Sequence, residues 1–185
     1  MKKFICTAAV LGITLVQASS LGINVNSDDV EVNGKMDITS AIGFGSGTSY
    51  FLSADYLHTD DDNLFKAGFG ASNTLSGAEG LTFTFGLEGV FGDSYVAMPL
   101  FGEAKLRLPL DEPMPATSLS ARFDYAPSVL SFVDADQYLE YRFEADVEVI
   151  NNVHLYGGYR NIDTDYESHD YNLNDSWYGG LKINF

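Results

Sequence analysis

The chain has 185 residues, with 26 acidic and 10 basic side chains and a formal net charge of −16 at pH 7. So acidic a chain is repelled by nucleic acid, and no nucleic-acid partner is expected. Its one cysteine, Cys6, lies close to the start of the sequence, and a single cysteine cannot form a disulfide framework.

The N-terminal segment has the pattern of a secretory signal peptide. Lys2 and Lys3 precede an apolar stretch from Phe4 to Val16, and small residues offer cleavage after Ala18 or after Ser20. The stretch is too short to span a bilayer, so its removal is expected.

The mature protein, residues 21–185, is expected to be a single domain without cysteine, because Cys6 leaves with the signal. Removing Lys2 and Lys3 as well leaves 8 basic against 26 acidic residues, a formal charge of −18. Thiolate catalysis and cysteine-based metal sites are therefore excluded.

Alternation of apolar and polar side chains predicts about ten short strands separated by turn residues. The predicted strands are Leu21–Asn26, Ile38–Phe44, Tyr50–Leu57, Phe65–Ser72, Leu81–Phe91, Leu100–Leu108, Ser118–Tyr125, Tyr138–Val149, Val153–Arg160 and Trp177–Phe185. The pattern is typical of an all-β fold, an antiparallel up-and-down transmembrane barrel. Leu21–Asn26 is the weakest of the ten, and eight strands are the alternative.

The predicted strand Tyr138–Val149 shows both faces plainly. Every second residue from Leu139 to Val149 is apolar, and most residues between them are charged. Successive side chains of a strand point to opposite faces, so one face suits lipid and the other a polar lumen. A soluble sandwich is the alternative, but the glycine and alanine residues on the apolar faces would build a poor packed core.

Charges of both signs fall on the predicted inward faces, where confinement favours ion pairs. The expected lumen network comprises Glu88, Glu103, Lys105, Arg107, Arg122, Asp124, Glu140, Arg142, Glu144, Arg160 and Lys182. A barrel of this size is about filled by its own side chains, which favours a plugged lumen.

Connection lengths predict which end of each strand faces outward. Asn161–Asp175 is expected to be a long outer loop, and Ile150–Asn152 a tight inner turn. This assignment places surplus acidic residues in outer loops: Asp60, Asp61, Asp62, Asp134, Asp136, Asp163, Asp165, Glu167, Asp170 and Asp175. Weak binding of divalent cations there, bridging to lipopolysaccharide, is the most that these loops suggest.

The end of the chain resembles the closing strand of bacterial outer-membrane barrels. The apolar positions Trp177, Leu181, Ile183 and the terminal Phe185 lie on one face. Such an ending is typical of the signal that the barrel-assembly machinery recognises. The expected location is the outer membrane, with lipid and lipopolysaccharide as surroundings.

Two groups of residues have the right types for hydrolysis at the outer rim. His58 precedes Asp60, and Ser168-His169-Asp170 follow in the last predicted loop. Loops of this composition are usually just soluble, so no enzyme, cofactor or metal site is expected. Asp163–Glu167 also lacks the later glycine and glutamate of an EF-hand loop.

Three segments resemble the YfaZ family of small outer-membrane proteins: Leu52–Asp62, Leu155–Asn161 and Tyr178–Phe185. The resemblance covers most of the mature chain and is least in Leu21–Lys35. It implies a small barrel in a Gram-negative outer membrane and brings no established activity or catalytic residues.

These features favour a structural or interaction barrel with a plugged, ion-paired lumen. A narrow channel for small solutes is the alternative, and a rim-sited hydrolase is a third.

Overall fold

The computed structural model describes residues 19–43, 47–59, 63–78, 80–92, 95–110, 113–133, 135–166 and 169–185. The predicted signal peptide lies outside these residues, as do Asp60, Asp61, Asp62, Asp134, Glu167 and Ser168. Among the described residues, no helix is long and apolar enough to cross a membrane.

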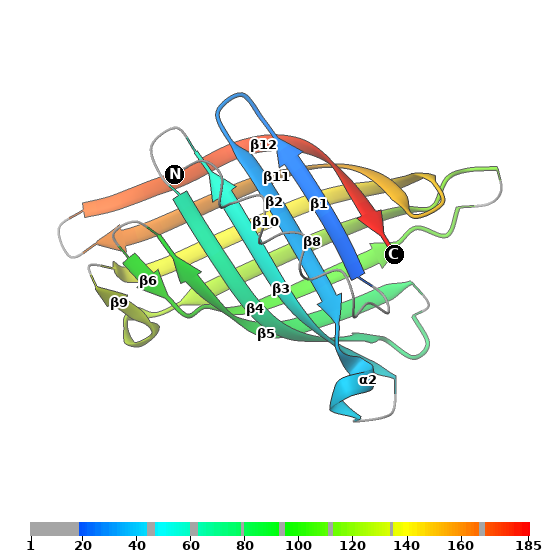
Figure 1. The fold of residues 1–185 in the computed structure, drawn as a ribbon, viewed down its shortest axis with the longest axis horizontal. Coiled ribbons are helices and arrows are strands. Elements are labelled where there is room, and N and C mark those ends of the chain that lie inside the picture. The colour runs from blue at the N-terminus through cyan, green and yellow to red at the C-terminus, as the bar shows by residue number, and fades with distance from the viewer. Residues whose placement is uncertain are drawn as a thin grey trace, which may run out of the picture.

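Ten strands of the described chain form a closed antiparallel barrel (Figure 1). They are β1 (Ser19–Val25), β2 (Val30–Asp37), β3 (Thr48–His58), β4 (Asn63–Thr74), β5 (Leu81–Phe91), β7 (Leu100–Arg107), β8 (Thr117–Ala126), β10 (Ala135–Ile150), β11 (Val153–Tyr166) and β12 (His169–Asn184). Each strand pairs with its neighbours along the chain, and β1 pairs with β12 to close the ring. The predicted fold class and the count of ten are confirmed.

The two ends of the barrel carry different short elements. The strands β6 (Tyr95–Ala97) and β9 (Ser131–Val133) pair with each other, and the 3-10 turn η1 (Ser128–Leu130) precedes β9. The short helix α2 (Thr39–Ile42) lies at the opposite end of the barrel (Figure 1).

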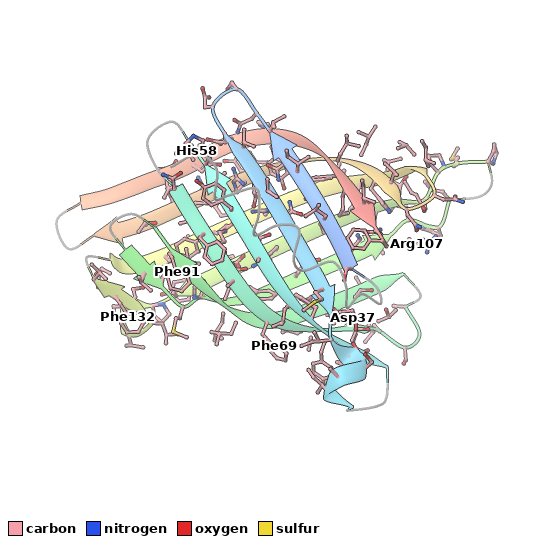
Figure 2. The ribbon with its side chains drawn as sticks, viewed as in Figure 1. Asp37, His58, Phe69, Phe91, Arg107 and Phe132 are labelled. Atoms are coloured by element: carbon pink, nitrogen blue, oxygen red, sulfur yellow. The ribbon has the colours of Figure 1, made fainter. Side chains whose placement is uncertain are left out.

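The first described residue, Ser19, meets Phe185 at the end that carries α2, which we call the terminus end; the other is the far end. The backbone N–H groups of Ser19 and Phe185 each donate to the carbonyl of the other, at 2.9 Å. Figure 2 places Asp37 and Arg107 toward the terminus end, and His58 and Phe132 toward the far end. Because even-stranded barrels keep both termini in the periplasm, the terminus end is assigned to that side.

Large apolar side chains cover the outer surface of the barrel. They include Leu21, Ile23, Leu52, Phe65, Phe69, Phe83, Phe85, Leu87, Phe123, Phe143, Leu155, Trp177, Leu181 and Ile183, all exposed. Buried charged residues lie on the opposite face of the same strands, so the predicted alternation places apolar side chains toward lipid and charge toward the lumen.

The second strand lies earlier in the chain than predicted. Residues 30–37 form β2, whereas Thr39–Ile42 form a helical turn that ends at Gly43 in the left-handed conformation, with φ of 71°. The predicted strand Ile38–Phe44 is wrong over its described residues, because Ile38, Ala41 and Ile42 also have the spacing of one helical turn. The prediction missed β2 because Gly34 contributes no side chain to its apolar face.

The predicted outer loop Asn161–Asp175 is also wrong. β11 continues to Tyr166 and β12 begins at His169, so the two strands form a long hairpin (Figure 1). Backbone pairing continues where the side chains have become polar, which hydrophobic alternation does not detect. The connection lengths predicted longer loops on the outer side, and this is not found at the far end. Residues 26–29 and 59–62 there are short connections, whereas residues 38–47 at the terminus end form a longer one.

Candidate functional site in the lumen

The far end of the lumen is filled by an apolar cap. It consists of Leu57, Leu64, Val90, Ala97, Ala126, Tyr138, Ile162 and Leu173, with Leu130 packed against them. Ala97 and Leu130 come from β6 and η1, so the far-end elements between the long strands contribute to the cap. Burial of these side chains removes apolar surface from water and closes this part of the lumen by packing.

A layer of buried charges lies beneath the cap, and Tyr138 joins the two. The Tyr138 hydroxyl donates to Glu140 Oε2 at 2.5 Å. Lys66 Nζ, from β4, forms an ion pair with the same oxygen of Glu140 on β10. These two strands are four places apart in the ring of ten, so the pair reaches across the lumen.

Glu31 is the centre of the charge layer. One of its oxygens accepts from Arg142 Nη2 at 3.0 Å, and the other accepts from Arg160 Nη1 at 2.6 Å. Asn24 also donates to Glu31, at 2.7 Å. Since Glu31 and Arg160 are almost fully buried, water does not compete for these contacts.

Three arginines lie side by side in the sheet. Arg122 on β8 is directly opposite Arg142 on β10, which is directly opposite Arg160 on β11. Neighbouring like charges repel each other, so each guanidinium needs carboxylates of its own. Arg122 contacts Asp124 at 2.6 Å and Glu88 at 3.1 Å, and Arg160 contacts Asp29 at 3.5 Å in addition to Glu31.

The charge layer consists of charges that are buried and paired with one another. Glu31, Glu88, Asp124, Glu140 and Arg160 are all inaccessible to solvent or nearly so. Buried charges are costly unless they are paired, and separating such a pair costs about 3–5 kcal/mol. An ion moving through this layer would have to break several of these pairs together.

Toward the terminus end the lumen widens into a polar cavity of about 350 Å³. Its lining includes hydroxyl groups from Ser20, Ser53, Ser72, Thr82, Thr84 and Ser120. These side chains are short, so they leave space open here, whereas longer charged side chains fill the lumen nearer the far end. Ser20 on β1 and Asn184 on β12 are paired at the terminus end of the barrel, and both line the cavity. The cavity therefore lies at the end assigned to the periplasm.

A second set of polar contacts lies on one wall of this cavity. Lys182 Nζ contacts Asp146 at 2.6 Å and Glu144 at 3.8 Å. His154 Nδ1 lies 2.8 Å from Asp146, and its Nε2 lies 2.8 Å from the Asn184 side-chain nitrogen. His154 therefore uses both ring nitrogens in hydrogen bonds inside the lumen.

Eight of the predicted network residues form ion pairs among the described residues: Glu88, Arg122, Asp124, Glu140, Arg142, Glu144, Arg160 and Lys182. Glu103 and Lys105 instead line the cavity without an ion pair in this part of the chain, because the lumen is wide there. Arg107 is exposed at the end of β7 and likewise has no ion pair within the described chain.

The sequence-based network omitted Asp29, Glu31, Lys66 and Asp146, which all take part in ion pairs. Glu31 was missed together with β2. Lys66 and Asp146 were on predicted inward faces, so that alternation alone could have added them.

The candidate rim chemistry is only partly described. His58 Nδ1 contacts the side-chain oxygen of Asn63 at 2.9 Å, and Tyr56 donates to the same oxygen at 2.7 Å. His169 and Asp170 are described only as backbone of β12. Within the described residues, no group of three or more His, Cys, Asp or Glu side chains could hold a metal ion.

The predicted assembly residues all point outward from β12 or its end. Trp177 is 77 % exposed, and Leu181, Ile183 and Phe185 are about half exposed. Trp177 also packs on Tyr159, with ring centroids 5.4 Å apart.

A family model described as YfaZ precursor matches residues 1–185. The chain belongs to the YfaZ family. Among curated proteins, no sequence matches it. The family, the barrel and its porin-like fold place this YfaZ protein in the outer membrane.

Solved structures of small porins share the fold of this YfaZ barrel. A KdgM porin in complex with disordered oligogalacturonate is 9 % identical, with a TM-score of 0.52, covering 91 % of this chain and 99 % of that one. Another KdgM porin structure has 10 % identity, a TM-score of 0.48 and coverages of 91 % and 99 %. A NanC porin has 11 % identity, a TM-score of 0.39 and the same coverages.

Proposed function

We propose that this YfaZ protein is a closed structural or interaction barrel that does not conduct ions at rest. The observation that carries the proposal is the pair of stacked seals in the lumen, the apolar cap above and the charge layer below. Either layer alone would hinder an ion. Together they leave the wide cavity open only toward the terminus end.

Recording from refolded protein in planar bilayers tests this proposal. The wild-type barrel is expected to show conductance near zero. A charge-layer variant, Glu31→Ala with Arg160→Ala, removes one buried pair of opposite charge, and a cap variant, Leu57→Ala with Ile162→Ala, opens the packing. Each is expected to conduct only briefly, and the combination of all four changes is expected to conduct steadily.

Two controls make this experiment decisive. Each variant must keep the heat-modifiable gel mobility of a folded barrel, and Arg107→Ala, outside both layers, should conduct no more than the wild type. Steady current through the wild-type barrel would overturn the plugged lumen.

A narrow channel for small solutes is the second candidate, and the cavity favours it. The cavity already opens about 350 Å³ of the lumen to the terminus end. Movement of the cap and of the charge layer would extend it to the far end. The KdgM porin of similar fold was solved with an oligogalacturonate, an acidic sugar chain; steady wild-type current would promote this candidate.

We propose further that the protein acts without catalysis or a cofactor, and that its partners are those of an outer-membrane barrel. Lipid and lipopolysaccharide surround the apolar outer face, and the barrel-assembly machinery recognises the last strand. Weak divalent binding at acidic far-end residues would bridge to lipopolysaccharide phosphates. A rim-sited hydrolase remains the third candidate, and an assay of lipid A turnover with purified protein tests it.

A further inference from the structure

The cavity at the terminus end carries four charged side chains that stand apart from the ion pairs. Lys35 comes from β2, Asp55 from β3, and Glu103 and Lys105 from β7; all four line the cavity. None of them forms an ion pair within the described residues, in contrast to the charge layer directly above.

We propose that this cavity binds a small zwitterion of amino-acid or dipeptide size, taken from the periplasmic side. Two ammonium and two carboxylate groups without an ion pair among the described residues offer contacts for a ligand that carries one charge of each sign. The ligand carboxylate would contact Lys35 or Lys105, and its ammonium would contact Asp55 or Glu103. This inference goes beyond the closed barrel and holds whether or not the lumen conducts.

Lys35 is held in place by an aromatic ring instead of a carboxylate. Its Nζ lies 4.2 Å from the centroid of the Phe51 ring, and Phe51 packs on Phe101 with centroids 6.5 Å apart. A cation over a ring face is attracted by the ring quadrupole. The Lys35 ammonium can therefore donate to a ligand carboxylate without breaking an ion pair of the protein.

Two buried acceptors on the same wall also lack partners. Glu88 is fully buried and uses Oε2 for Arg122, while its Oε1 has no hydrogen bond among the described residues. Ser53 Oγ is likewise without a partner there. Buried polar atoms are nearly always hydrogen-bonded, so these two atoms are available to accept from a donor in the cavity, such as a ligand ammonium.

The size and the remaining lining suit a small polar ligand. Ligand pockets range from about 300 to 1,000 Å³, and the volume of about 350 Å³ lies at the lower limit. Side-chain hydroxyls of Ser72, Thr82, Thr84 and Ser120 can bond the uncharged part of such a ligand.

Calorimetric titration of the refolded mature barrel in detergent micelles tests the inference. The probes are glycylglycine, which carries both charges, N-acetylglycine, which is only an anion, and glycinamide, which is only a cation. Glycylglycine is expected to bind at least about tenfold more tightly than either single-charge probe. Equal binding of N-acetylglycine, or no heat from glycylglycine at millimolar concentration, would overturn the zwitterion site.

Variants locate the site. Lys35→Met and Glu103→Gln are each expected to weaken glycylglycine binding about tenfold or more. The double exchange Lys35→Glu with Glu103→Lys swaps the positions of the positive and negative side chains. A zwitterion can bind with its two ends reversed, so this variant should restore most of the affinity. Arg107→Gln is the matched control on β7 and should leave binding unchanged.

Each variant is first shown to fold by its heat-modifiable gel mobility. Unchanged binding in both single variants, or no rescue by the exchanged pair, would contradict the assignment.

Discussion

Glu31 joins two arginines that the sheet places next to each other. Arg142 and Arg160 are direct neighbours on β10 and β11; Arg142 donates to both oxygens of the Glu31 carboxylate, and Arg160 donates to Oε2. The carboxylate comes from β2, on the opposite side of the closing seam between β1 and β12. This one side chain therefore ties the two sides of the seam together inside the lumen.

Replacing Glu31 by Gln should destabilise the barrel strongly. The change leaves Arg142 and Arg160 adjacent without their shared anion, and breaking a buried pair costs about 3–5 kcal/mol. Urea titration of the refolded barrel, followed by gel mobility, measures the loss. Glu103→Gln is the matched control, because Glu103 has no ion pair in the described chain, and it should change stability little; equal losses would contradict the central position of Glu31.

Neighbouring residues of β5 should respond in opposite ways to a new arginine. Phe85 is 65 % exposed on the lipid face, and a cation there costs about 2–4 kcal/mol near the bilayer midplane. Phe85→Arg should therefore reduce the amount of folded barrel in membranes.

Thr84→Arg is the control for Phe85→Arg. Thr84 lines the cavity and lies directly opposite Glu103, so the new arginine gains a carboxylate partner. Heat-modifiable protein in membrane fractions measures both variants, and equal damage from the two would contradict the face assignment.

The first strand fixes where the signal peptide should be cut. Ser19 belongs to β1 and exchanges two backbone hydrogen bonds with Phe185. Cleavage after Ala18 keeps these bonds, while cleavage after Ser20 removes them. Mass spectrometry of the mature protein should therefore find Ser19 as its first residue; a first residue of Leu21 would contradict this prediction.

The last strand should need an aromatic side chain at its end for efficient insertion. Phe185→Ala keeps the backbone pairing with Ser19 but removes the outward-pointing ring, so it separates recognition from strand pairing. Secretion should persist while outer-membrane insertion falls several-fold, and Phe185→Tyr should remain close to wild type. Fractionation of cells measures both, and normal insertion of Phe185→Ala would remove Phe185 from the assembly signal.

Strand positions could be predicted wherever one face is continuously apolar, as in β5 and in the last part of β12 from Trp177 onward. Alternation failed at Asn161–Tyr166, since backbone pairing with β10 and β12 continues there although Asn161, Asp163 and Asp165 interrupt the apolar pattern. It also failed at β2, whose Gly34 contributes no side chain to the outer face. Local sequence could place Arg142 in the lumen, but not choose Glu31 as its partner, because that contact depends on the register of the closed ring.

The barrel has two differently accessible ends, and cysteine labelling can test this polarity. The only cysteine of the chain, Cys6, lies in the predicted signal peptide, so an added cysteine would be the only one in the mature barrel. Val129→Cys lies in the exposed η1 turn at the far end. A membrane-impermeant maleimide should label it in intact cells.

Ser72→Cys is the matched position for the terminus end, because Ser72 lines the cavity there. It should react only after the outer membrane is permeabilised, since the charge layer and the cap block the route from the far end. Rapid labelling of Ser72→Cys in intact cells would contradict either the orientation or the seal.

The seam between Ser19 and Phe185 also sets the timing of folding. Its strands, β1 and β12, are the first and last strands of the described chain, so the ring cannot close until β12 has been exported. Until then both strands present unpaired backbone groups, which are templates for aggregation. The two edges therefore stay open to wrong pairing from the export of β1 until β12 pairs with it.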